Sequence, residues 1–146
     1  MNPTREKYYR FVFALSSVYD IVLGVIFALF YRRAFAFLGI AAKLPDFGGY
    51  LTLIGAFLFV IGVAYCVIAL GDLRRNRDLI MVGVLYKLAY CASAFYYFAT
   101  GNIPHVIFVS LFGVVDLVFF VLMTECWLCV SRTVLPEPTL AGAQTK

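Results

Sequence analysis

Four apolar stretches, at residues 11–31, 50–70, 79–98 and 105–130, are the feature that most restricts how this chain can fold. Each is long enough to cross the hydrocarbon core of a bilayer as a helix, which takes about 20 residues. A helix also pairs its own backbone polar groups, which a lipid environment requires. The pattern predicts an all-α, four-transmembrane-helix up-and-down bundle.

The composition agrees with an integral membrane protein. Hydrophobic residues make up 64% of the chain and charged residues 14%, whereas soluble domains have about 45 to 50% and about 25%. The formal charge of +4 does not indicate a nucleic-acid partner, because the basic residues flank the apolar stretches. We expect one membrane domain at 11–131, a cytoplasmic lead at 1–10 and a disordered cytoplasmic tail at 132–146.

The first apolar stretch is expected to stay in the protein rather than to be removed as a signal peptide. It is longer than the apolar core of a signal peptide, it contains Asp20, and no convincing cleavage site follows it. The segment at 32–49 is moderately apolar but too short to span. We interpret it as a short interfacial segment between the first and second helices.

The distribution of Lys and Arg predicts the orientation, because these residues are enriched in cytoplasmic loops. One side holds eight of them and the other holds three. The eight are Arg5, Lys7, Arg10, Arg74, Arg75, Arg77, Arg132 and Lys146, and the three are Arg32, Arg33 and Lys43. We expect a bacterial cytoplasmic (inner) membrane protein with both termini in the cytoplasm.

Three charged residues lie near the middle of apolar stretches: Asp20, Lys87 and Asp116. A charge at the bilayer centre costs about 2.5 to 3.5 kcal/mol on insertion scales, so it normally faces a partner. Equal depth predicts that the three form one buried polar network, with Tyr19, Tyr86 and Tyr90 as its possible neighbours. Two carboxylates sharing one ammonium favour the uptake of a proton, as a relay requires. The alternative is a static clasp that fixes the helix register.

Two further patterns concern small residues and thiols. Gly48, Gly55, Gly62 and Ala69 recur every seven residues, which favours close helix packing or, alternatively, room for a quinone or an acyl chain. Cys126 and Cys129 have the spacing of a thiol pair. Their predicted cytoplasmic position, where thiols stay reduced, and the lack of cysteines in the predicted external loops favour two small apolar residues on a helix.

The overall pattern resembles the small DoxX-like, four-helix membrane proteins of bacteria. The resemblance is carried by the sequences at 48–55, 61–62, 74–80 and 115–118 and extends over most of the chain. It implies a helical bundle in the inner membrane, and some members of that group are accessory subunits of membrane redox systems. No catalytic residue of the group can be assigned to this sequence.

No catalytic set and no metal-ligand cluster are recognisable in the sequence, so an enzyme is not the favoured interpretation. We expect an accessory or assembly subunit, or a small membrane protein that binds a hydrophobic ligand. No cofactor is predicted, although a quinone or a lipid would fit, and a membrane-protein partner or a homo-oligomer is compatible with the sequence. The alternatives are a small proton-coupled transporter that uses the buried Asp and Lys residues, and a quinone-linked or thiol oxidoreductase.

Overall fold

The computed structural model describes residues 2–134, which form helices and loops with no β-strand in that part of the chain. The long helices are α1 (Pro3–Leu29), α3 (Gly49–Leu70), α4 (Arg77–Ala99) and α6 (Asp116–Val134). Within residues 2–134, four helical segments are long and apolar enough to cross a membrane, the fourth being Val106–Arg132. The predicted all-α bundle of four spans is confirmed, and it is consistent with an integral membrane protein.

The fourth span is built from three consecutive pieces. α5 (Val106–Phe108) leads into the π-helical segment η2 (Val109–Val115), which continues into α6 at Asp116. A π-helical turn is wider than an α-helical turn and changes the direction in which the following side chains project. The widened segment therefore helps to set the direction of Asp116.

The first helix begins much earlier than its apolar stretch. The side chain of Asn2 caps it by accepting a hydrogen bond from the backbone N–H of Thr4 at 3.1 Å, and Pro3 occupies the first turn, where its missing N–H costs nothing. Arg10 and Glu6 form an ion pair one turn apart at 2.9 Å. Residues 3–10 of the polar lead are thus helical. The predicted disordered tail at 132–146 is wrong for residues 132–134, which continue α6, and its residues 135–146 lie outside the described part of the chain.

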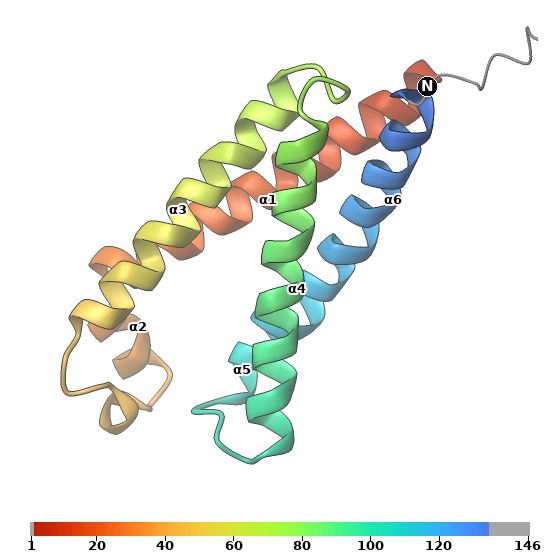
Figure 1. Cartoon of the computed structure of the whole chain (residues 1–146). Helices are drawn as coiled ribbons and strands as arrows, with labels where there is room; N and C mark the ends of the chain where they lie inside the picture. The colour runs from red at the N-terminus through yellow and green to blue at the C-terminus, as the bar shows by residue number, and fades with distance from the viewer. Residues whose placement is uncertain (1, 135–146) are drawn as a thin grey trace, which may run out of the picture.

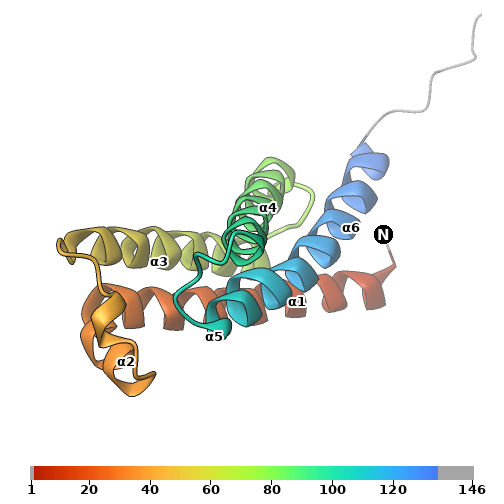
Figure 2. The ribbon, with the colours of Figure 1, turned by 90° about the horizontal axis from the view of Figure 1, so that it is seen from below.

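The two ends of the bundle carry different connecting segments (Figure 1). α2 (Tyr31–Phe37), the 3-10 turn η1 (Ala41–Lys43) and the α4–α5 loop lie at one end, whereas the N-terminus and the α3–α4 loop lie at the other. Figure 2 shows α2 turned away from the line of α1. The segment at 32–49 therefore forms short helices that do not continue the span.

The α4–α5 connection turns at Gly101, whose φ of 70° lies in the left-handed region that glycine adopts without a steric penalty. The N–H groups of Gly101 and Asn102 donate to the carbonyls of Phe98 and Tyr97 at 3.1 and 2.9 Å. These bonds satisfy carbonyls that the end of α4 would otherwise leave unpaired.

Helices α1 and α3 pack along most of their length, as Figures 1 and 2 both show. Glycines allow this approach: a Cβ on Gly55 would lie 2.7 Å from the Gly24 carbonyl oxygen, and one on Gly62 would lie 2.8 Å from the backbone nitrogen of Ile21. Ser17 adds a hydrogen bond by donating to the Gly62 carbonyl at 2.7 Å. We call these two helices the α1–α3 pair, and the other two spans, which also pack on each other, the α4–α6 pair.

Buried side chains form two apolar clusters along the bundle. The first lies toward the N-terminal end of α1 and includes Phe13, Ile80 and Met123; the second lies beyond it and includes Leu23, Ala94 and Phe112. On α1, on α4 and along the fourth span, a buried charged residue stands between the members of the two clusters. The sequence order on three helices thus places the charges in the middle of the core.

Candidate functional site

The three buried charges meet in one cluster, which we call the charge cluster: Asp20 on α1, Lys87 on α4 and Asp116 on α6. The Nζ of Lys87 donates to both carboxylate oxygens of Asp20 at 2.8 Å and to Oδ1 of Asp116 at 2.8 Å. The relative exposures are 0% for Asp20 and Lys87 and 1% for Asp116. The three side chains are thus removed from lipid and water, and their hydrogen bonds link the α1–α3 pair to the α4–α6 pair.

Three carboxylate oxygens surround the ammonium at hydrogen-bond distance. Lys87 has three N–H donors, and three carboxylate oxygens accept from it at equal distances. Asp20 receives two of these bonds and Asp116 receives one. If all three groups are ionised, the cluster carries a net charge of −1.

Aromatic rings surround the ammonium. The Nζ of Lys87 lies 5.1 Å from the ring centroid of Tyr19, 5.5 Å from that of Tyr65 and 5.4 Å from that of Phe119. These distances fall within the range of cation–π attraction, which is stronger where the cation is desolvated. The rings therefore stabilise the positive charge while they exclude water from it.

The sequence predicted some of these neighbours and missed others. Tyr19 lies at the ammonium, and Tyr86 and Tyr90, which pack on each other with ring centroids 4.8 Å apart, lie near the carboxylates. Tyr65 was missed, although a tyrosine inside the second apolar stretch is a usable signal. Its hydroxyl donates to the carbonyl of Gly83 at 3.1 Å, which fixes its ring beside Lys87.

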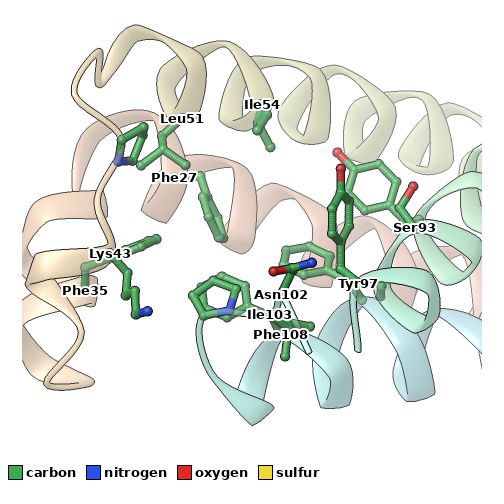
Figure 3. Close-up of a pocket in the computed structure, with 15 residues that line it drawn as sticks. Phe27, Phe35, Lys43, Leu51, Ile54, Ser93, Tyr97, Asn102, Ile103 and Phe108 are labelled. Carbon is green, nitrogen blue, oxygen red and sulfur yellow. The ribbon is translucent and has the colours of Figure 1, made fainter. Parts of the chain in front are cut away.

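A cavity of about 390 Å³ adjoins the second apolar cluster, at the end of the bundle that carries α2 and the α4–α5 loop. We call it the end pocket (Figure 3). Most of its lining is apolar or aromatic and comes from both helix pairs: Phe27, Phe35, Pro45, Leu51, Ile54, Tyr90, Ala94, Tyr97, Ile103, Pro104, Phe108 and Phe112. Small-molecule sites in proteins typically have about 300 to 1,000 Å³ and a lining of this kind.

A few polar side chains complete the lining of the end pocket: Lys43, Ser93 and Asn102. In Figure 3, Lys43 projects from one side of the pocket, and Asn102, Tyr97 and Ser93 stand on the other side. Within residues 2–134, Lys43 forms no ion pair, and it is the only charged residue of the lining. The pocket thus combines an apolar interior with one cationic group.

The end pocket and the charge cluster are close neighbours along the chain. Tyr90 lines the pocket three residues after Lys87, and Phe112 lines it four residues before Asp116. These separations correspond to about one helical turn, or about 5 Å at 1.5 Å per residue. The rings of Tyr90 and Phe112, with centroids 5.5 Å apart, pack together between the two sites. Helix α4 and the segment η2 therefore connect the pocket to the cluster.

The remaining sequence candidates lie elsewhere. Cys126 is buried in the first apolar cluster and Cys129 is half-buried beside it, both as free thiols on α6. Gly48 contacts the side chain of Tyr31 rather than another spanning helix, and Ala69 is buried in the first cluster. Within residues 2–134, no group of three or more His, Cys, Asp or Glu side chains is placed to hold a metal ion.

Comparison with protein-family models, with curated proteins and with solved structures finds no match to this chain.

Proposed function

We propose that this chain is a membrane-embedded binding protein for a lipid-like amphiphile, such as an acyl lipid or a quinone, which it holds in the end pocket. The observation that carries the proposal is a cavity of about 390 Å³ lined by both helix pairs. Its apolar lining suits an acyl or isoprenoid chain, because burial of apolar surface is favourable by about 25 cal/mol per Å².

The polar groups of the lining support an amphiphile over a pure hydrocarbon. Lys43 and Asn102 lie on opposite sides of the pocket (Figure 3) and can donate hydrogen bonds to a head group. Such a protein can also act as an accessory subunit that presents the ligand to a larger membrane partner. Mild-detergent purification from the source membrane tests the accessory role by showing whether a partner co-purifies.

The binding proposal is tested by native mass spectrometry of the purified protein with added palmitic acid or decylubiquinone. We expect adducts of one molecule in the wild type. Ser93→Phe should remove them, because Ser93 lines the end pocket and the added ring would occupy it. Ala92→Phe is the matched control, since Ala92 is exposed on the same helix and does not line the pocket. Identical adducts in both variants, or none in the wild type, would contradict the proposal.

The charge cluster favours a second candidate function, a proton-coupled carrier. Groups that bind a proton in the middle of a membrane are typical of such proteins. In proteoliposomes, a proton gradient should then drive substrate uptake that Asp116→Asn abolishes. A protein that binds its ligand but shows no gradient-driven flux would support the first function alone.

We also propose that both termini face the cytoplasm of a bacterial inner membrane. The described basic residues support this orientation: Arg5, Lys7, Arg10, Arg74, Arg75 and Arg77 stand at the end that carries the N-terminus, and Arg32, Arg33 and Lys43 stand at the end that carries α2. The end pocket would then open toward the outer leaflet.

A further inference from the structure

We propose that the charge cluster is a proton-binding site: at neutral pH it holds one proton on Asp116, so that the cluster is electrically neutral. This site lies apart from the end pocket and does not require a lipid-like ligand. Three observations support the bound proton: the number of charges, their burial and the unequal hydrogen bonding of the two carboxylates.

The cluster has an excess of negative charge. One ammonium and two carboxylates leave one uncompensated negative charge, and all three side chains are at most 1% exposed. Within residues 2–134, neither carboxylate forms a salt bridge to a second cation. An unpaired ion in a low-dielectric interior is so costly that such groups normally become neutral instead. A proton on one carboxylate removes that charge without any change in packing.

Neutral titratable side chains surround the cluster. They are the phenols Tyr19 on α1, Tyr65 on α3 and Tyr86 and Tyr90 on α4, together with the Cys91 thiol on α4. Tyr65 donates its proton to Gly83, and Cys91 donates to the Gly113 carbonyl with 3.6 Å between donor and acceptor. A neutral phenol or thiol supplies no positive charge. The compensating charge must therefore come from a bound proton.

The two carboxylates differ in their contacts with the ammonium. Asp20 accepts two hydrogen bonds from Lys87, one at each oxygen, whereas Asp116 accepts one at Oδ1. Hydrogen bonds from an ammonium stabilise the ionised form of a carboxyl group. Asp20 is thus the better anion, and Asp116, whose Oδ2 accepts nothing from Lys87, is the better site for the proton.

The test uses infrared spectroscopy of the full-length protein in detergent at pH 7, where the C=O stretch of a protonated carboxyl group is separate from carboxylate bands. We expect the wild type to show one such band that Asp116→Asn lacks. Asp20→Asn should lack it as well, because Asp116 then ionises to pair with Lys87. Lys87→Met should show two bands, because both carboxyl groups then need a proton to be neutral.

Thermal unfolding distinguishes the two carboxylates, because asparagine resembles a protonated aspartic acid in shape and charge. The apparent Tm of Asp116→Asn should stay within about 2 °C of the wild type, and that of Asp20→Asn should fall by about 5 °C or more, since it loses the doubly bonded anion. A wild type without the acid band would overturn the proton site. An Asp116→Asn protein less stable than Asp20→Asn would overturn the assignment. If a variant fails to fold, the infrared spectra of the wild type and the folded variants still decide whether the cluster holds a proton.

Discussion

At the residue scale, the charge cluster could be predicted because a charged side chain in the middle of a membrane span is energetically unfavourable unless it has a partner. A charge at the bilayer centre needs a partner, and three such residues at the same depth have only one another. The sequence could not show how Lys87 divides its hydrogen bonds, two to Asp20 and one to Asp116, because that division depends on helix rotation. It also could not place Phe119 at the ammonium, since one phenylalanine among many carries no distinguishing signal.

Replacement of Lys87 by methionine keeps the length of the side chain and removes its charge. Breaking one side of a buried pair costs about 3 to 5 kcal/mol, because a carboxylate that has lost its cation must either stay charged in the interior or take up a proton. We expect Lys87→Met to lose that much unfolding free energy, and Lys87→Met with Asp20→Asn to recover more than half of it. Chemical denaturation in mixed micelles measures both.

The matched control for this prediction is Lys43→Met, which removes an exposed lysine. Exposed substitutions usually change stability by less than about 0.5 kcal/mol. If Lys87→Met is as well tolerated as Lys43→Met, or if the double variant is no more stable than Lys87→Met, then Asp20 is not the principal partner of the ammonium.

At the scale of elements, hydropathy located the four spans but not their ends or their internal geometry. Helix α1 begins at Pro3, eight residues before the apolar stretch, because the Asn2 cap starts it in a polar sequence. The π-helical segment Val109–Val115 is uniformly apolar apart from Ser110 and Gly113, so nothing local distinguishes it from an α-helix. Such a segment depends on packing with the rest of the bundle, which a single stretch of sequence does not contain.

The contact between α1 and α3 predicts a sharp difference between two neighbouring residues. Gly55 faces the backbone of α1 at Gly24 and Ala28, whereas Ala56 is exposed. We expect Gly55→Leu to destabilise the fold by about 3 kcal/mol, since the obstacle is backbone that cannot move aside. Ala56→Leu adds a similar bulk toward lipid and should be nearly neutral. Equal melting temperatures for the two variants would show that α1 and α3 are not held this closely.

The orientation proposal predicts which loops are accessible from each side. In a variant without the four native cysteines, Arg75→Cys in the α3–α4 loop and Asn102→Cys in the α4–α5 loop place thiols at exposed positions at opposite ends of the bundle. A membrane-impermeant maleimide added to intact cells should label only the Asn102→Cys protein. Labelling of Arg75→Cys alone would reverse the proposed orientation.

At the scale of the whole molecule, the end pocket was the feature least accessible to sequence reasoning. Helices α3 and α4 lie close at their connecting loop and splay apart toward the other end (Figure 1), where the pocket residues gather. Its lining comes from both helix pairs and from the loop before α5. A small-residue stripe on α3 suggested room for a lipid, but Gly55 and Gly62 pack on α1 instead. No single helix carries the pattern, since the cavity results from how two pairs diverge.

This arrangement predicts that a ligand stabilises the whole bundle, because a molecule in the end pocket contacts both helix pairs. A ligand that binds only the folded state stabilises it by about 2.7 kcal/mol at a free concentration of 100 times its Kd. Palmitic acid should therefore raise the apparent Tm of the wild type and of Ala92→Phe by similar amounts and leave Ser93→Phe unchanged. Methyl palmitate tests the head group alone, because it has the same acyl chain but no carboxylate. The ester should raise the Tm of the wild type less than the acid does if Lys43 binds the carboxylate, and Lys43→Gln should remove this difference. If palmitic acid raises the Tm of the wild type, Ala92→Phe and Ser93→Phe equally, it acts through the detergent rather than through the end pocket.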